Sequence, residues 1–393
     1  MGEDVAGRVG RAYRSVKRKR SKSPEPEAPP KNDAELFDRD RRRELEQLGH
    51  ANILVIGQTG VGKSTLINAI FRKPLAAAGI GRPVTKVVQR FEDPDVPVTL
   101  YDTKGVELGD SKRRVIRDYK RLIADKRKGR AEDHIHIAWY CMDAGQTRVE
   151  DYDLEIMREL AHEVPVILVF TQTIDDERAD GLERAVQDVP LMGCMRTLAQ
   201  PRTIGTQTLP QRGLEELVRR TNDILPEAVR RAFVNAQGVV LDLKVDQSRA
   251  VVVAASAAAA GAAAAPIPMS DAALLRPIQL GMLASITAVF GIDIKADKVL
   301  SLAKGLVGQG GMEQAGKRLV KELAKHVPGG NVVNAAVAGT LTGALGEAYI
   351  RLCAETLRRQ ADGRPLPDAE FLLDAYRGLL AKRASPPGPD RPT

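Results

Sequence analysis

One nine-residue stretch limits what this chain of 393 residues can fold into: GQTGVGKST, residues 57–65. It follows the apolar run NILVI directly and opens the helical pattern LINAIF. Gly57, Gly62, Lys63 and Ser64 match the spacing G-x-x-x-x-G-K-S/T in the strand–loop–helix setting that this motif requires. A glycine-rich turn that matched by chance would not need that setting, so the stretch predicts a loop that binds phosphate groups.

The residue types of this loop suit phosphate chemistry. Glycines let the backbone N–H groups from Gly60 to Thr65 surround phosphates at the positive end of the following helix. Lys63 would supply a positive charge to the β- and γ-phosphates, and the Ser64 hydroxyl would be a Mg²⁺ ligand. The residues predicted to hold this end of a nucleotide are Gly57, Gln58, Thr59, Gly60, Val61, Gly62, Lys63, Ser64 and Thr65.

Two later segments fit the same site. YDTKGVE ends a buried strand with Asp102, which is predicted to hold Mg²⁺ through water, and the N–H of Gly105 would meet the γ-phosphate. In GIGRPVTK, Thr85 would complete the Mg²⁺ shell only when a γ-phosphate is bound, so its loop is predicted to be an order–disorder switch. The predicted metal ligands are therefore Ser64, Thr85 and Asp102, and the predicted catalytic residues are Lys63, Thr85 and Gly105.

On the motifs GQTGVGKSTLINAIF, RPVT and YDTKGVE, residues 50 to 222 resemble the Era-like and septin-like P-loop GTPases of the translation-factor class. The resemblance implies binding of GTP and GDP, dependence on Mg²⁺ and a switch cycle. One departure is Lys104, since proline is commoner at that position in such proteins.

The sequence lacks one residue that Ras-type enzymes use for GTP hydrolysis. Val106 follows the switch glycine at the position where Ras-type enzymes carry the glutamine that orients water, and valine cannot form that hydrogen bond. Water would have to be aligned by the Thr85 carbonyl, by Glu107 or by a group supplied on dimerisation through the GTPase domain. Arg82 and Arg148 are candidate arginine fingers, although a solvated surface charge is the favoured interpretation of each. We expect slow intrinsic turnover that assembly stimulates.

The base-reading segment VFTQTIDD departs from the usual pattern. Thr171 and Gln172 occupy the Asn/Thr and Lys positions, but Ile174 stands where a carboxylate should accept the guanine N1–H and N2–H protons. Asp175 follows one residue later, so either Asp175 replaces the missing carboxylate or guanine selection is weakened. In RTLAQ, the Ala199 N–H is predicted to lie near the guanine O6. Together these features favour GTP, with Asp175 expected to recover most of the selectivity.

Strand-like and helix-like stretches alternate up to about residue 222. The predicted strands are 52–57, 85–93, 96–103, 134–143, 164–173 and 194–199. Alternation of this kind predicts an α/β domain, with a mainly parallel sheet covered by helices on both faces. From residue 225 onward no convincing strand is found, and alanine is dense, which favours an all-α domain.

Residues 250–269, AVVVAASAAAAGAAAAPIPM, carry no charge over a length that could cross a bilayer. Alanine inserts poorly, and a tightly packed, buried helix is the favoured interpretation. The stretch PIPMSDAALLRPIQLGMLASITAVFGI and the later VPGGNVVNAAVAGTLTGALGEAYI resemble an uncharacterised alanine-rich helical domain that accompanies such bacterial GTPases. The resemblance covers about residues 225–355 and carries over no catalytic residue.

The predicted organisation follows from these patterns: a basic disordered tail at 1–32, a leading helix at 33–49, the GTPase domain at 50–223, the alanine-rich helical domain at 224–384 and a frayed tail at 385–393. The net charge of +8 favours an acidic partner. The three cysteines are too few and too far apart for a disulfide framework, which favours the reduced cytoplasm. No apolar signal segment is found, so no signal peptide is expected. The expected location is the cytoplasm, with a peripheral position at the inner face of the membrane as the alternative.

Three hypotheses remain open at this point. The leading one is a Mg²⁺-dependent GTP switch that controls how residues 224–384 contact a membrane or a protein partner. The second is an RNA- or ribosome-associated assembly GTPase that uses the basic tail, although the chain shows no aromatic stacking platform for RNA. The third is a structural protein that holds GTP without significant hydrolysis, which Val106 keeps open.

Overall fold

The computed structural model of the chain describes residues 29–71, 82–83, 88–93, 96–103, 112–264, 271–292, 299 and 330–384. The first 28 residues of the basic tail and the loop residues Thr85, Gly105, Val106 and Glu107 lie outside these ranges. The roles predicted for them therefore remain predictions.

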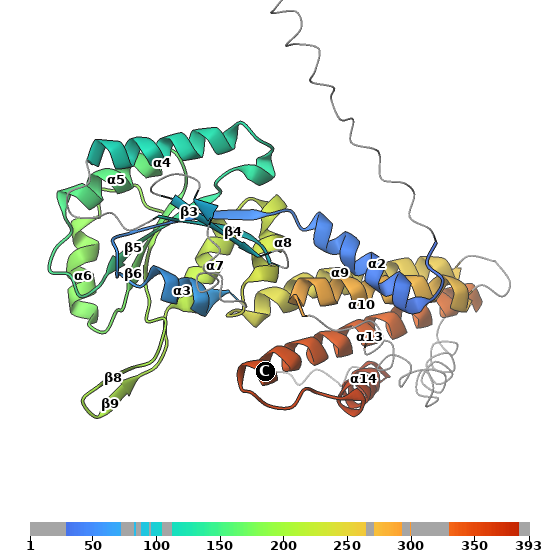
Figure 1. Cartoon of the computed structure of the whole chain (residues 1–393). Coiled ribbons are helices and arrows are strands. Elements are labelled where there is room, and N and C mark those ends of the chain that lie inside the picture. The colour runs from blue at the N-terminus through green and yellow to red at the C-terminus, as the bar shows by residue number, and fades with distance from the viewer. Residues whose placement is uncertain are drawn as a thin grey trace, which may run out of the picture.

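A seven-stranded sheet forms the centre of the first half of the chain (Figure 1). Its strands are β1 (Ala51–Ile56), β2 (Arg82–Pro83), β3 (Val88–Asp93), β4 (Val96–Thr103), β5 (Ile137–Asp143), β6 (Val166–Thr171) and β7 (Cys194–Arg196). The spatial order is β2-β3-β4-β1-β5-β6-β7. The pairs from β4 through β1, β5 and β6 to β7 are parallel, and β3 is antiparallel to both β2 and β4. The predicted mainly parallel sheet is thus confirmed.

Helices cover both faces of this sheet, as the sequence predicted. The helices and the one 3-10 turn of this half are α3 (Lys63–Ile70), α4 (Lys112–Arg127), η1 (Ala131–Asp133), α5 (Asp151–Ala161), α6 (Asp176–Ala185), α7 (Leu214–Ile224) and α8 (Glu227–Ala236). Helices α3, α7 and α8 bury their apolar side chains in one cluster, and α4, α5 and α6 bury theirs in another. Along β1 the side chains alternate, with Ile53 and Val55 in the first cluster and Leu54 and Ile56 in the second.

A two-stranded hairpin that the sequence did not predict projects from this half (Figure 1). It pairs β8 (Arg202–Ile204) with β9 (Gln207–Leu209) in antiparallel register. Its strands have three residues each and are almost wholly exposed, so they carry no alternation of buried and polar residues. Without that alternation the strand pattern has no sequence signal.

The second half of the described chain is helical. Its helices are α9 (Leu241–Ala264), α10 (Asp271–Phe290), α13 (Gly330–Ala361) and α14 (Ala369–Ala384). The leading helix α2 (Asp33–Gln47) packs against α10, and its fully buried Phe37 belongs to the apolar cluster of the helical half. Burial of a phenylalanine contributes about 1.5–3 kcal/mol, so α2 stabilises the helical half although it precedes the sheet in sequence.

The uncharged stretch from residue 250 is helical along its described part and buries one side. The buried positions of α9 fall on one stripe and include Val252, Ala255 and Ala259. Helix α13 approaches so closely that a Cβ on Gly346 would lie 2.5 Å from Val252 Cγ2 and 2.9 Å from Met282 Sδ. Close packing is thus seen along this stripe, while other positions of the same stretch are exposed, with Val253 at 70%. Among the described residues, no helix is both long enough and apolar enough to cross a membrane.

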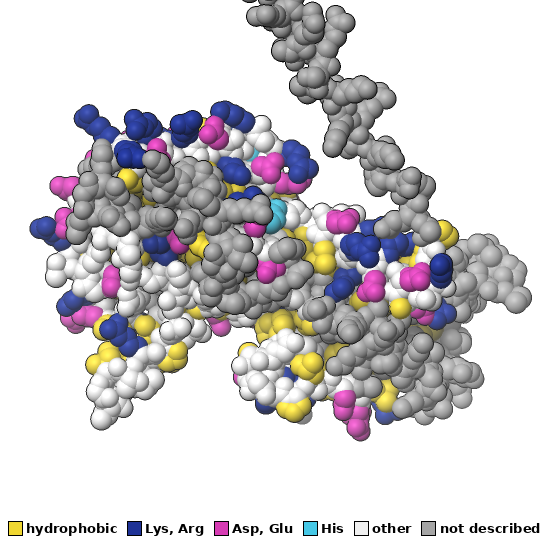
Figure 2. Space-filling model, in the orientation of Figure 1, with side chains coloured by type: hydrophobic (Ala, Val, Ile, Leu, Met, Phe, Trp, Pro, Cys, Tyr) yellow, Lys and Arg dark blue, Asp and Glu magenta, His cyan; other side chains and the backbone are white. Residues whose placement is uncertain are grey.

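Basic side chains gather over α4 at one edge of the molecule (Figure 2). Several are paired with acidic neighbours, for example Arg114 with Asp118 at 3.9 Å and Lys128 with Asp125 at 2.7 Å. Exposed pairs of this kind contribute little to stability, and this face is a solvated charged surface.

Candidate nucleotide site

The phosphate loop lies between β1 and α3, and three of its glycines have backbone angles that favour glycine. The φ angles of Gly57, Gly60 and Gly62 are +151°, +85° and +96°. A Cβ on Gly57 would also overlap the carbonyl oxygen of Cys141 on the neighbouring strand β5. Gly62 precedes the first residue of α3, so the loop ends at the helix N-terminus, where free N–H groups and the helix dipole favour an anion.

Lys63 is the first residue of α3 and is only 7% exposed. Its ammonium donates hydrogen bonds of 3.0 Å to the carbonyl oxygens of Gly57 and Gln58. A buried ammonium must keep such partners, because losing them costs several kilocalories per mole. The charge is thus held inside the loop, where phosphate oxygens can replace or join the two carbonyls.

Asp102 and Ser64 are the described residues among the predicted Mg²⁺ ligands, and both carry oxygen atoms. In the parallel register of β1 and β4, Asp102 is the partner of Val55, next to the start of the phosphate loop. Burial raises the pKa of the Cys141 thiol to about 12, while Lys63 lowers it and Asp102 raises it by smaller amounts. Both charges therefore lie close to one buried thiol. A hydroxyl and a carboxylate are oxygen ligands of the kind Mg²⁺ takes, so these residues fit that ion.

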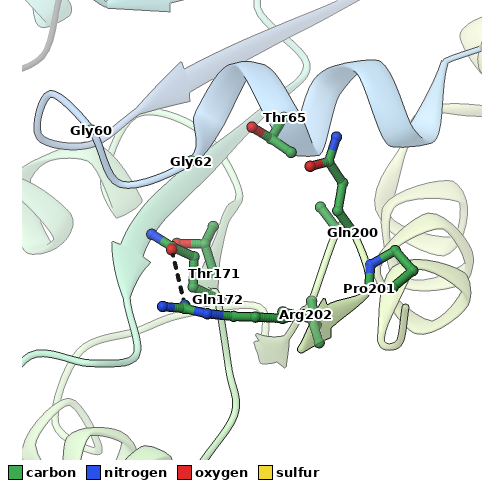
Figure 3. A pocket seen from close by; sticks show the side chains of 10 residues that line it. Gly60, Gly62, Thr65, Thr171, Gln172, Gln200, Pro201 and Arg202 are labelled. Carbon is green, nitrogen blue, oxygen red and sulfur yellow. Dashed lines mark hydrogen bonds between the residues drawn. The ribbon is translucent and has the colours of Figure 1, made fainter. Parts of the chain in front are cut away.

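A cavity of about 290 Å³ opens beside the loop (Figure 3). Its walls are Gly60, Gly62 and Thr65 on one side, Thr171 and Gln172 at the end of β6, and the segment 198–202. The structure thus brings the predicted base-side residues Thr171, Gln172 and Ala199 together with three residues of the predicted phosphate site.

Thr171 joins the two sides of the site. Its hydroxyl lies 2.5 Å from the carbonyl oxygen of Val61 and 3.0 Å from that of Met142. A hydroxyl has one proton to donate, and both neighbours are acceptors, so this proton is directed at a carbonyl. Thr171 therefore anchors the phosphate loop to β6 and β5.

Gln172 is held in an unusual conformation. It is the one described residue other than glycine with a positive φ, +54°. Its amide Nε2 donates to Asp143 Oδ2 at 2.9 Å, and Arg202 Nη1 donates to its Oε1 at 3.4 Å. The other carboxylate oxygen of Asp143 accepts the N–H of Gly145 at 2.8 Å. The end of β5 thus fixes the orientation of the Gln172 amide, since a carboxylate can only accept.

The expectation for Asp175 needs correction. Asp175 is the N-cap of α6, where its carboxylate accepts the N–H of Arg178 at 3.1 Å, and it does not line the cavity. The physical reason is local: the first free N–H groups of a helix attract a capping carboxylate, and α6 begins at the next residue. Ile174 is 41% exposed and supplies no polar group in its place.

The start of α6 is fixed further by arginines. Arg212 donates to both carboxylate oxygens of Asp176, at 3.0 and 2.9 Å, and to the carbonyl of Thr173 at 3.1 Å. The Arg212 hydrogen bond holds the pKa of Asp176 below its ordinary value. These contacts keep the loop after β6 in a conformation that turns Asp175 toward α6.

The two candidate arginine fingers lie elsewhere. Arg148 is 76% exposed and donates to Glu150 at 2.8 Å, outside the residues that line the cavity. Arg82 is in β2, where its register partner is Arg90 of β3. Neither position tests the role predicted for it.

Asp143 and Arg202 are site residues that sequence reasoning missed. The sequence did contain a pattern that could have placed Asp143 at the site. Asp143 ends a strand next to β6, and the carboxyl ends of neighbouring parallel strands meet at one edge of a sheet. No sequence pattern could have placed Arg202 there, since it belongs to the unpredicted hairpin.

The loop, the mainly parallel sheet and the flanking helices define the nucleotide-binding domain of a P-loop protein. Residues 52–172 match the family model described as 50S ribosome-binding GTPase, and residues 230–371 match the one described as a domain of unknown function (DUF697). The first half of this chain is therefore a P-loop GTPase domain, and a helical region that matches the second model follows it.

The individual proteins that resemble this chain have low sequence identity to it. Septin-9 of Rattus norvegicus is 26% identical over 165 residues, which cover 35% of this chain and 29% of that protein. Septin-9 of Homo sapiens is 26% identical over 185 residues, which cover 39% and 31%. The chain thus spans less than a third of the length of these relatives. A crystal structure of a probable GTP-binding protein engB is 20% identical, with a TM-score of 0.32 over 44% of this chain and 98% of that one.

Proposed function

We propose that this protein is a Mg²⁺-dependent GTP-binding switch with slow hydrolysis, whose nucleotide state controls the contacts of its helical half. The observation that carries the proposal is the phosphate loop, in which a buried Lys63 ammonium faces the loop carbonyls at the N-terminus of α3. Such a loop binds the phosphates of a nucleotide through backbone N–H groups and one ammonium.

Mg²⁺ would be held by Ser64 and Asp102, with Thr85 joining when a γ-phosphate is present. When bound, the ion neutralises charge on the β- and γ-phosphates. The protein's own contribution is to hold the phosphates at the helix terminus and to place the Asp102 carboxylate at the end of β4.

The far end of α3 offers a route from the nucleotide to the helical half. The N–H of Gly238, after α8, donates to the carbonyl of Ile70 at 2.9 Å, and Phe71 forms an isolated bridge with Gln237. The Phe71 ring lies between Trp139 and Phe233, at 6.3 Å from each centroid. A helix that begins at the phosphate loop is thus tied at its other end to the junction of α8 and α9.

That junction is itself joined to α10 by buried polar groups. Lys244 of α9 is fully buried, and its ammonium donates to the carbonyls of Val234 at 2.6 Å, Asn235 at 2.9 Å and Val289 at 3.4 Å. The Asn235 amide donates to the carbonyl of Ala288. Because buried polar groups are costly to leave unpaired, these hydrogen bonds hold α8, α9 and α10 together, which supports coupling between the two halves.

The experiment is GTP binding and phosphate release by the wild type and by Lys63→Ala, with Lys128→Ala as a matched control. Lys128 directly follows α4, and its side chain is 76% exposed. We expect Lys63→Ala to lower GTP affinity by about a hundredfold, because it removes a charged partner worth roughly 3 kcal/mol. Lys128→Ala should bind as the wild type does.

Equal GTP affinity for the wild type and Lys63→Ala would contradict nucleotide binding at this loop. The rate of phosphate release is a separate measurement. We propose that pairing of two GTPase domains supplies the group that orients the attacking water, which Val106 cannot do. The rate per molecule should rise with protein concentration, and a high rate that dilution leaves unchanged would contradict assembly-stimulated hydrolysis. A membrane or protein partner for residues 224–384 would be detected as nucleotide-dependent binding to the full chain.

A further inference from the structure

The base side of the cavity contains no carboxylate among the described residues that line it. Of the lining residues that the structure describes, Arg202 alone is charged, and it stands at the start of β8 where the hairpin leaves the GTPase domain. Ile174 occupies the position of the expected carboxylate, and Asp175 caps α6. The described walls therefore present a base with one charged donor and with no charged acceptor.

Guanine has two polar edges that a protein can recognise. A carboxylate accepts protons from N1 and from the 2-amino group on one edge. O6 and N7 on the other edge are acceptors, and an arginine guanidinium matches that pair with two parallel N–H groups. Thr171 cannot donate a hydrogen bond to N7, because its hydroxyl proton is directed at a backbone carbonyl. Among the described lining side chains, Gln200 and Arg202 also carry donors, and of these two only Arg202 has two parallel N–H groups that match the pair O6 and N7.

Arg202 is placed for that role. The Gln172 amide donates from Nε2 to the Asp143 carboxylate at 2.9 Å, which leaves its Oε1 to accept a hydrogen bond from Arg202 at 3.4 Å. Figure 3 shows the Arg202 side chain extending along the cavity toward Gln172, with Gly60, Gly62 and Thr65 on the opposite side. A base between these walls would meet the guanidinium with one edge.

We propose that Arg202 is the specificity-determining residue of this site and that it reads the acceptor pair O6 and N7 of a 6-oxopurine. This inference rests on the proposed function, since it concerns the base of the nucleotide that the phosphate loop holds. The cavity then rejects adenine, because the 6-amino group of adenine is a hydrogen-bond donor and would face the N–H donors of Arg202. The 2-amino group of guanine is not read, so hypoxanthine is accepted nearly as well as guanine.

The test is the affinity of the full chain for GTP, ITP and ATP with Mg²⁺, in the wild type and in Arg202→Met. Methionine keeps an unbranched stem and removes the donors. For the wild type we expect GTP and ITP to bind within about threefold of each other and ATP about tenfold or more weakly, the discrimination of one bidentate pair. In Arg202→Met, ATP should come within about threefold of GTP, while the ratio of ITP to GTP stays unchanged.

Arg184→Met is the matched control, since Arg184 lies on α6 and donates to the carbonyl of Asp180, away from the cavity. It should keep all wild-type ratios. An ITP affinity about thirtyfold below that of GTP in the wild type would overturn the proposal, because an acceptor would then be reading the 2-amino group. An equal loss of all three affinities in Arg202→Met would also overturn it, because Arg202 would then be contacting ribose or phosphate.

Failure of the proposed function gives a different result. If no triphosphate binds the wild type more tightly than it binds Lys63→Ala, the phosphate loop does not hold a nucleotide, and both proposals fall together. If binding depends on Lys63 but GTP and ATP bind the wild type equally, nucleotide binding stands and the assignment of Arg202 is wrong.

Discussion

The two sides of the nucleotide cavity are built in different ways. On the phosphate side, nine consecutive residues supply the loop, and the essential groups are backbone N–H groups, three glycines with positive φ and one lysine. On the base side, side chains arrive from β5, β6, the segment 198–201 and the hairpin. A local motif fixes its own geometry, whereas a site gathered from separate segments depends on how the whole domain folds.

The largest effect that separates the two sides is expected for Gly57→Ala. A Cβ there would overlap the Cys141 carbonyl oxygen, so the loop must move away from β5. We expect GTP affinity to fall by about a hundredfold or more, since close-packed backbone cannot shift without moving the N–H groups that hold phosphate. Isothermal titration calorimetry would measure the loss, and thermal unfolding would report how much of the fold remains.

Gly60→Ala is the matched control for that variant. A Cβ on Gly60 meets no atom within 4 Å, so only the positive φ opposes it. That strain is worth about 1–2 kcal/mol, so the affinity should fall by no more than roughly thirtyfold. If Gly57→Ala bound GTP as well as Gly60→Ala does, the phosphate side would not depend on the close approach to β5.

A smaller and different effect is expected on the base side for Asp143→Asn. The substitution weakens the carboxylate contacts that orient the Gln172 amide and hold the Gly145 N–H. GTP affinity should fall about three- to tenfold, because charge-assisted hydrogen bonds are stronger than neutral ones. Binding of inorganic tripolyphosphate should not change. Asp125→Asn, on the exposed face of α4, controls for the loss of one charge. A comparable loss of tripolyphosphate binding would show that Asp143 acts on the phosphate side instead.

The same contrast explains what could be predicted from sequence. Gly57, Gly62, Lys63 and Ser64 were identified because spacing along the chain determines their positions, and the parallel sheet followed from alternating strands and helices. Asp175 was misplaced because helix capping competed for its carboxylate and won. Arg202 could not be found, since a short exposed hairpin leaves no pattern of buried residues.

The sequence also did not predict which helices pack against which half of the chain, for a similar reason. Helix α8 follows the predicted end of the GTPase domain, yet Val229, Ala232 and Phe233 are buried in the cluster on the sheet. Helix α2 precedes β1, yet Phe37 is buried in the helical half. An amphipathic helix shows that it has an apolar face, but the pattern does not say which neighbour will cover that face.

The smallest expected effect concerns the support of β1, which carries the phosphate loop. The N–H of Asn52 donates to His136 Nδ1 at 2.9 Å, which requires an unprotonated nitrogen, and His136 Nε2 lies 3.1 Å from the Ala131 carbonyl. Burial lowers the pKa of His136 from its ordinary value of about 6.5. The stability that the neutral ring contributes is therefore complete above about pH 6.5 and is lost as the pH falls through the lowered pKa.

Urea unfolding at pH 7.5, 6.5 and 5.5 would measure this dependence. We expect the unfolding midpoint of the wild type to fall with pH, and a smaller fall in His136→Gln. His162→Gln, at the exposed C-cap of α5, is the control and should follow the wild type. An equal pH dependence in His136→Gln and the wild type would show that His136 does not bind fewer protons in the folded state.

The central claim is that the nucleotide is held chiefly from its phosphate end, and competition against labelled GTP in the presence of Mg²⁺ tests it most directly. The competitors are inorganic tripolyphosphate, which has no base, and guanosine, which has no phosphate. We predict that tripolyphosphate displaces labelled GTP from the wild type and loses this ability in Lys63→Ala, while guanosine at millimolar concentration displaces none. Displacement by guanosine without displacement by tripolyphosphate would contradict the account.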